Sequence, residues 1–498
     1  MPRIFWSRNS SWPVRLAQVG LLIWVAFSFG FQNNVGLADN GDYLLTMRLF
    51  TSGPVSIEPN WPPAGTAAWN NRFFNYWIPE WKFQWSYSRP ISSVELLWLP
   101  GAVLNYVFYS PSILDLRALS LFPKALLLIV VLLLFGWIDQ QSSRYRLPLY
   151  LAGALPLVLI VTTTDYLAYF NTFYRETASL VFLILLLASL LALRQRPGSR
   201  ARLLLCLSMI LLLAAAKPSA FYWGVLAVPA VVYATGLGQT LGEYAKQYLL
   251  WGLGATVLLL AAAGFVTHHS GCTQCNRYHS LFCGTLVFSR QPEAHLAALG
   301  MSDAIDCIGV RAFVPPGTAC IAKYGNRISF RDSLRIIIDE PMIALRMIGY
   351  ATDNMQDISL EYLGHYARDN PTIQAPSITF CDNCSNRFWS ANSTSPQNLW
   401  SSLKYHIFPT GGWLIVALVG FAALSLWGLT RGRLLADLSL LGLLAVFGCL
   451  ADMSVAIAGE GVSELIKHLF LANALFDVSA VIAVCLIVVL CVDLIAVK

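Results

Sequence analysis

The stretch LFLANALFDVSAVIAVCLIVVLCV, from Leu469 to Val492, decides the fold of this chain. Asp477 is the single charged residue of this stretch. The length of the stretch exceeds the roughly 20 apolar residues that a helix needs to cross a bilayer. The rest of the chain is similar, because 56% of the 498 residues are hydrophobic and only 12% are charged. A soluble domain carries roughly 25% charged residues. We therefore predict an integral membrane protein.

Other apolar stretches precede this one, and together they predict an all-α polytopic membrane protein with about ten transmembrane helices. Within lipid, only helices and closed barrels satisfy their own backbone hydrogen bonds, and these stretches have the length of helices. The remaining candidate spans are Leu16 to Phe31, Ser120 to Ile138, Leu147 to Val161, Ala178 to Leu193, Leu203 to Ala216, Ser219 to Ala234, Leu249 to Val266, Gly412 to Trp427 and Leu434 to Leu450.

Arginines in the short joints between the spans predict their orientation, because Lys and Arg are enriched in cytoplasmic loops. The joints 144–146, 194–202 and 431–433 fall on one side, and Arg3, Arg8 and Arg15 put the N-terminus there too. Both termini are then cytoplasmic. The first span is a poor signal peptide, so we expect it to remain as an anchor. The net charge of +6 thus reports orientation and not a nucleic-acid partner.

The segments on the opposite, outer side divide the chain into three parts. Residues 1–266 form an N-terminal transmembrane module with a first outer loop at 32–119, residues 267–411 form an outer or periplasmic insert, and residues 412–498 form the C-terminal helices. The insert is too long for a structureless loop. Within it, Arg331 to Met347 has a helical apolar pattern that Pro341 interrupts. In the first loop, Leu96 to Tyr109 is apolar but short, which favours an interfacial or re-entrant helix.

Most of the cysteines lie in the insert. An oxidising outer compartment favours two or three disulfides there, with one thiol left over. The paired Cys-x-x-Cys spacings, with His268 and His269 nearby, also suit zinc, and this alternative stays open. The cysteines of the insert are Cys272, Cys275, Cys283, Cys307, Cys320, Cys381 and Cys384.

Two carboxylates follow directly after the first span. Asp39 and Asp42 lie in the segment Gly36 to Tyr43, at the outer surface of the membrane. A carboxylate beside a medium of low dielectric constant can have a raised pKa and act as a general base. The alternative is an Asx turn in which the acids bond only backbone.

The second outer segment, Thr164 to Glu176, is polar and aromatic where a bare connector would suffice. Its acids could bind a hydroxyl-rich ligand and its arginine an anion, whereas the alternative is an aromatic belt at the headgroups. We take as substrate-binding candidates Asp165, Tyr169, Asn171 and Glu176, and as a phosphate-binding candidate Arg175.

The last outer segment ends in Glu464, Lys467 and His468, just before the final span. In a helix, spacings of three and four place these side chains on one face. We expect Glu464 to contact substrate, and Lys467 and His468 to bind a lipid-linked phosphate. Lys217, in an outer turn between two spans, is a further phosphate candidate; snorkelling towards headgroups is the alternative for all of these cations.

These acidic outer segments, the cytoplasmic N-terminus and the long first loop resemble the GT-C superfamily, the multi-span glycosyltransferases that use polyprenyl-phosphate-linked sugars. The resemblance implies that Asp39 or Asp42 is the catalytic base and that Asp165 helps to bind acceptor or donor. The segment Glu464 to Asn473 also looks like the final outer loop of bacterial members. The resemblance to bacterial members therefore implies a location in the bacterial inner membrane.

The resemblance implies an inverting transferase that moves a sugar from a polyprenyl-phosphate donor to a hydroxyl of a cell-envelope glycan or glycolipid. Membrane lipids are the other expected partners, and a divalent metal could assist. One alternative is a glycan polymerase or ligase that uses a polyprenyl-diphosphate-linked oligosaccharide. Another is a lipid or glycan transporter, which acids within the C-terminal spans would serve. These acids are Asp437, Asp452, Asp477 and Asp493.

Overall fold

The computed structural model describes residues 11–31, 35–37, 46, 49–54, 80–86, 92–236, 273–356, 358, 365–367 and 399–496. Within these residues the chain is mostly helical, and seven helices or helix runs are long and apolar enough to cross a membrane. They are α1 (Trp12–Phe31), α5 (Leu116–Asp139), the run α6 (Ser143–Leu149), η3 (Tyr150–Ala154) and α7 (Leu155–Val161), α9 (Glu176–Gln195), α21 (Gly411–Gly428), α22 (Arg433–Glu460) and α24 (Phe470–Ala496). The prediction of a polytopic helical membrane protein is confirmed.

Two further predicted spans are present as shorter or broken helices. One is α10 (Arg200–Ala214), and the other is divided into η5 (Pro218–Ala220), α11 (Trp223–Leu226) and α12 (Val228–Thr235). Proline at the first turns of η5 and α12 accounts for the breaks, because proline starts a helix but does not continue one. The one predicted span not yet accounted for, Leu249 to Val266, lies outside the described residues.

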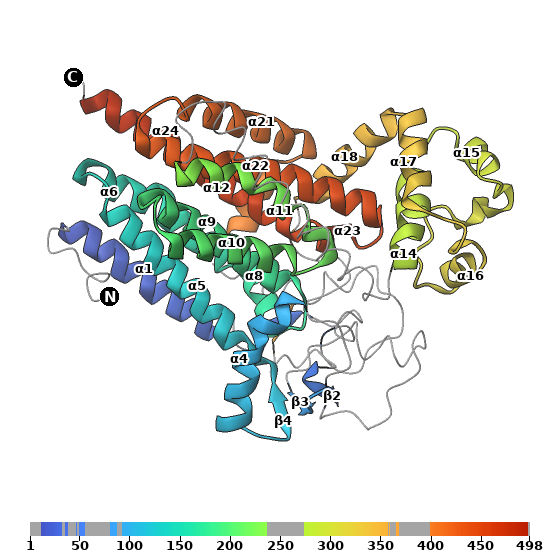
Figure 1. Ribbon diagram of the computed structural model, residues 1–498, viewed down its shortest axis with the longest axis horizontal. Helices are drawn as coiled ribbons and strands as arrows, with labels where there is room; N and C mark the ends of the chain where they lie inside the picture. Colours follow the sequence, from blue (N-terminus) through green and yellow to red (C-terminus); the bar gives the residue numbers. More distant parts are fainter. Residues whose placement is uncertain are drawn as a thin grey trace.

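The C-terminal helices pack closely through small residues. A Cβ added at Gly442 of α22 would lie 2.4 Å from the Ser425 Oγ of α21, and one at Gly428 would lie 2.2 Å from the Ser439 Oγ. Small residues let transmembrane helices approach one another without a hydrophobic driving force between them. Helix α24 in turn packs along α22 over much of its length (Figure 1).

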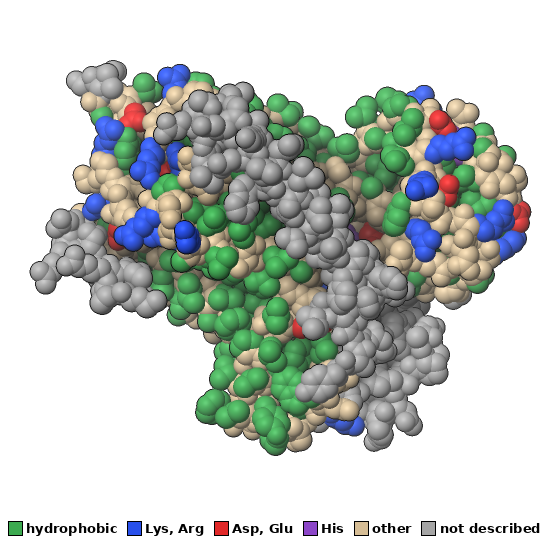
Figure 2. All heavy atoms as spheres, viewed as in Figure 1, with side chains coloured by type: hydrophobic (Ala, Val, Ile, Leu, Met, Phe, Trp, Pro, Cys, Tyr) green, Lys and Arg blue, Asp and Glu red, His purple; other side chains and the backbone are tan. Residues whose placement is uncertain are grey.

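Both termini lie at the same end of the helix bundle, as Figure 1 shows. The arginine joints meet there: Arg144 pairs with Asp493 at 3.0 Å, and Arg194 pairs with Asp437 at 2.8 Å. Figure 2 shows Lys and Arg side chains gathered over this end, which we call the basic end. The grouping of the joints that the sequence predicted is therefore present in the fold.

Short strands and helix α4 (Ser93–Phe108) lie at the opposite end (Figure 1), which we call the outer end after the predicted orientation. In one antiparallel sheet β1 (Val35–Leu37) pairs with β5 (His365–Ala367); the other has the order β2 (Thr51–Pro54), β3 (Glu80–Phe83), β4 (Ile113–Asp115). In register, Trp81 of β3 faces Pro54 on one side and Leu114 on the other. With 16 residues, α4 has the short length that the sequence predicted for this stretch.

The insert forms a compact helical unit beyond the outer end (Figure 1). As predicted, the helical pattern is interrupted at Pro341, which is the N-cap of the second helix. The described helices are α14 (Thr273–Tyr278), η6 (His279–Thr285), α15 (Pro292–Ala298), η7 (Ser302–Cys307), α16 (Pro315–Tyr324), α17 (Phe330–Asp339) and α18 (Met342–Asn354), and α20 (Leu399–Ile407) follows in the chain.

Among the described residues, one disulfide is present, between Cys307 and Cys320. Cys283 is a buried thiol that donates a hydrogen bond to the Val310 carbonyl oxygen at 3.2 Å, and burial raises its pKa to about 12. It fits the expected unpaired thiol of the insert. Three further cysteines of the insert, Cys272, Cys381 and Cys384, lie outside the described residues, as do His268 and His269.

One predicted boundary is wrong. Helix α22 continues to Glu460, ten residues beyond the expected end of its span at Leu450. The last outer segment is therefore shorter than 451–468. The apolar run Val455 to Ala458 allows the helix to continue, and it ends only at Gly461, whose φ of 60° and ψ of −133° suit glycine alone.

Candidate functional site

The outer ends of several helices place charged side chains together, and we call this group the outer cluster. It consists of Glu176, Lys217, Glu460, Glu464, Lys467 and His468. The members come from the start of α9, the turn before η5, the end of α22 and α23 (Leu465–His468), which are far apart in the sequence. The fold thus brings together acids and cations that the sequence only placed on the same side.

Lys217 and Glu176 form the innermost pair of the outer cluster. Lys217 Nζ lies 3.5 Å from Glu176 Oε1, and the two side chains are 7% and 4% exposed. Lys217 Nζ makes no hydrogen bond among the described residues. Since a buried ammonium carries three donors, it has room for an anionic oxygen.

Lys467 lies close to both an acid and an aromatic ring. Its Nζ lies 3.5 Å from Glu464 Oε2 and 5.5 Å from the ring centroid of Tyr174. Glu464 precedes α23 and has a positive φ of 50°, so it is not helical as the sequence suggested. The predicted pair nonetheless forms, because the spacing of three residues is kept through the first turn.

Glu460 joins the insert to the outer cluster. The backbone N–H of Ala312 donates to His279 Nε2 at 3.0 Å, so His279 Nδ1 carries the proton and donates to Glu460 Oε2 at 2.8 Å. The other oxygen, Glu460 Oε1, lies 3.9 Å from His468 Nε2. A backbone bond from Val462 N–H to the Cys283 carbonyl oxygen at 2.9 Å fixes the same contact.

His468 differs from the cation that the sequence suggested. Burial lowers its pKa, and although Glu460 opposes this effect, Lys467 and Lys217 add to it. At neutral pH the imidazole is therefore mainly uncharged. Its expected role changes from a charge to a hydrogen-bond donor for a phosphate oxygen.

Asp165 and Asn171 are buried, and each has its own hydrogen-bond partner. Asp165 is fully buried and accepts a hydrogen bond from the Ser401 hydroxyl of α20. Asn171 is also fully buried, and its Oδ1 accepts from Lys124 Nζ at 3.4 Å. In this arrangement neither side chain belongs to the outer cluster, and their substrate-binding roles stay predictions.

Aromatic rings lie between the outer cluster and the segment that contains Asp165 and Asn171. The ring of Tyr169 lies 5.7 Å from that of Tyr174 and 4.3 Å from that of Phe470, measured between centroids. Trp81 of the first outer loop is fully buried, with its edge on Phe173 at 5.5 Å. Trp81 therefore stabilises the packing of the loop on the second outer segment.

Arg175 begins α9 beside the outer cluster. Its Nε is buried and makes no hydrogen bond among the described residues. Burial raises the pKa of Glu95, which lies in the first turn of α4, to about 7. Electrostatic attraction to Arg175 lowers this pKa, but its effect is smaller than that of burial. Glu95 is a carboxyl group of the outer end that the sequence reading missed, because α4 appeared only as an apolar stretch.

Asp39 and Asp42 lie outside the described residues, but both flanks of their segment are fixed. Strand β1, which ends at Leu37, packs against η4 (Ala168–Asn171). The Thr46 hydroxyl donates to the Phe173 carbonyl oxygen at 2.8 Å.

Acids within the C-terminal spans have protein partners. Besides the two pairs at the basic end, Asp452 accepts from the Tyr222 hydroxyl at 3.0 Å, and Asp477 lies 3.0 Å from Lys404 Nζ. These partners come from segments far apart in the chain, so the pairs could not be predicted from the sequence. They give each of these acids a partner within the protein, and the transporter alternative stays a prediction.

No group of three or more His, Cys, Asp or Glu side chains in the described part of the chain could hold a metal ion. The Cys-x-x-Cys pairs lie partly beyond that part, so the zinc alternative remains a prediction.

A bundle of membrane-spanning helices with one basic end and a charged, aromatic cluster at the other defines a multi-pass membrane protein with a polar outer site. The chain belongs to the family of the YfdI N-terminal transmembrane domain, whose model matches residues 7–496. The matched range runs across the insert. No curated protein and no solved structure matches the chain.

Proposed function

We propose that the protein is a GT-C-like membrane glycosyltransferase that moves a sugar from a polyprenyl-phosphate donor to a hydroxyl of an envelope glycan or glycolipid. The observation that supports this most is the outer cluster, where Lys217 and Lys467 lie buried and Lys217 Nζ makes no hydrogen bond among the described residues. Buried cations are retained at membrane depth mainly where they serve a function. The family membership over nearly the whole chain supports a membrane transferase of this kind.

In the proposed reaction, an acceptor hydroxyl attacks the anomeric carbon of the sugar. The bond from this carbon to the phosphate oxygen breaks, and the polyprenyl phosphate leaves with the electron pair. Asp39 or Asp42 takes the proton of the acceptor hydroxyl, an effect typically worth ~10²- to 10⁴-fold in rate. Single displacement inverts the configuration at the anomeric carbon.

The cations have a distinct role in this reaction. Lys217, Lys467 and Arg175 would stabilise the charge that grows on the leaving phosphate, and His468 would donate a hydrogen bond to it. Glu176 and Glu464, which pair with Lys217 and Lys467, hold these cations in place before the donor binds. Tyr174, beneath Lys467, and Tyr169 offer ring surfaces for a sugar.

The test measures transfer from polyprenyl-phosphate sugar by purified protein in nanodiscs. Asp39→Asn or Asp42→Asn should lower the rate by ~10²-fold or more while donor binding persists. Lys467→Met should weaken donor binding. Lys323→Met, at an exposed cation of the insert, should change neither the transfer rate nor donor binding. Full activity in both Asn variants contradicts the proposal. Turnover only with an oligosaccharide-diphosphate donor would instead favour a polymerase or ligase.

A further inference from the structure

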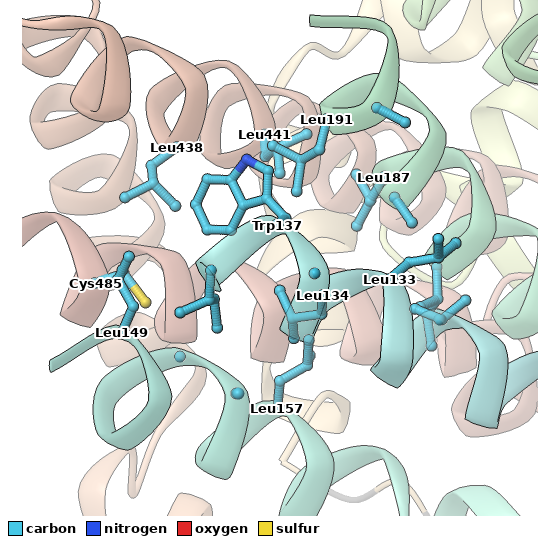
Figure 3. Close-up of a pocket in the computed structure, with 18 of the residues that line it drawn as sticks. Leu133, Leu134, Trp137, Leu149, Leu157, Leu187, Leu191, Leu438, Leu441 and Cys485 are labelled. Carbon is cyan, nitrogen blue, oxygen red and sulfur yellow. The ribbon is translucent and has the colours of Figure 1, made fainter. Parts of the chain in front are cut away.

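A cavity of about 390 Å³ lies inside the bundle, at its basic end and away from the outer cluster. Figure 3 shows apolar side chains of α5, α9, α22 and α24 that point into it, among them Trp137, Leu187 and Leu441. Its volume is in the range of ligand pockets, about 300–1,000 Å³. The lining is predominantly apolar, which suits an apolar occupant.

The polar residues of the cavity wall lie at one end. They are Asp139, Gln140, Gln195 and Arg202, which belong to the joints of the basic end. Asp139 is engaged by Gln18 and the Tyr150 hydroxyl, at 3.0 and 3.2 Å. The Arg202 guanidinium makes one hydrogen bond among the described residues, to the Ala192 carbonyl oxygen, and so keeps donors for an anion.

The depth of the cavity fits one leaflet. Its lining on α5 runs from Val130 to Gln140, which at 1.5 Å per residue is about 15 Å, half of the ~30 Å hydrocarbon core. Such a space suits a lipid chain that enters from one side of the membrane. Exposed Arg196 and Arg200 beside Arg202 add positive charge at the same level. Basic pockets between transmembrane helices are known to bind anionic headgroups.

We propose that this cavity binds one acyl chain of an anionic phospholipid from the leaflet at the basic end, with the lipid phosphate at Arg202. The occupant would replace the missing packing between α5, α9 and α24, the helices whose other ends carry or flank the outer cluster. This lipid is a resident of the bundle and not the transferase's donor. The inference therefore does not rest on the proposed function.

The test uses glycines whose added Cβ meets no atom within 4 Å. Gly136 lines the cavity, so Gly136→Leu should fill it; Gly420 lies on α21 outside the cavity, so Gly420→Leu is the matched control. The purified full-length chain is reloaded in nanodiscs of phosphatidylglycerol or phosphatidylcholine, and retained lipid is counted by native mass spectrometry. Wild type and Gly420→Leu should retain one phosphatidylglycerol, and Gly136→Leu none.

The headgroup contact has its own pair of variants. Arg202→Gln should lower the preference for phosphatidylglycerol by roughly fivefold, the effect of about 1 kcal/mol for one basic residue. Arg200→Gln, outside the cavity lining, should preserve most of it. Equal retention by Gly136→Leu and Gly420→Leu, or a wild type without anionic preference, would overturn the inference. A loss of sugar transfer with intact lipid retention would concern the proposed function alone.

Discussion

The two ends of the bundle both carry ion pairs, but they differ in exposure. At the outer end, the side chains of Lys404 and Asp477 are 0% and 1% exposed, whereas at the basic end those of Arg144 and Asp493 are 49% and 38% exposed. Water screens the second pair and not the first. The buried pair at the outer end therefore depends on each charge having its partner far more than the half-exposed pair at the basic end does.

The sharpest test of this difference removes one cation from each end. Lys404→Met leaves Asp477 buried without its counter-charge and should lower the free energy of unfolding by about 3–5 kcal/mol. Arg144→Met breaks a half-exposed pair and should cost about 1 kcal/mol or less. Thermal unfolding in detergent, followed by tryptophan fluorescence, measures both. Similar losses would mean that the two ends do not differ as their exposure suggests.

A second prediction concerns the contact between the outer end and the insert. A Cβ at Gly461 would lie 2.2 Å from the backbone carbon of Cys283, and the φ of 60° is unfavourable for other residues. Gly461→Ala should destabilise the protein by about 2–4 kcal/mol. Gly459→Ala, two residues earlier in open space, is the matched control and should be neutral or slightly stabilising. Equal melting temperatures would contradict the tight contact.

The smallest expected effect is a pH dependence from Glu95. Burial raises its pKa from 4.5 to about 7, so the folded protein keeps a proton that the unfolded chain loses in this range. Stability contributed by this group is complete below pH 4.5 and falls as pH rises to about 7, by about 2 kcal/mol once solvent screening of this partly desolvated group is allowed for.

Glu95→Gln should flatten the stability curve between pH 4.5 and about 7. Above that range the variant should have a higher melting temperature than the wild type. Glu293→Gln, at an exposed position of the insert, should leave the curve unchanged. Melting temperatures across the range, at constant ionic strength, provide the measurement. An unchanged slope in Glu95→Gln would assign the pH dependence to other groups.

The apolar stretches and the arginine joints were sufficient to predict most of the spans, their common basic end and several of the charged residues that meet at the opposite end. Membrane helices are predictable in this way because a bilayer requires about 20 apolar residues and internal backbone hydrogen bonds. The break at Pro341 followed from the missing N–H of proline. Each of these features depends on a local property of the chain.

The partners of the buried charges could not be predicted. His279 with Glu460, Lys404 with Asp477 and Tyr222 with Asp452 join segments that are far apart in sequence. The continuation of α22 to Glu460 was missed for the same reason, since packing against η6 of the insert supports those turns.

By itself, the sequence determined that this chain crosses the membrane repeatedly and that its arginine joints group at one end, because both follow from the transfer of residues between water and lipid. Only the tertiary structure decided which charge meets which, that His468 is mainly neutral, and that a cavity remains at the basic end. These depend on distances between helices, and side-chain packing over the whole bundle sets those distances.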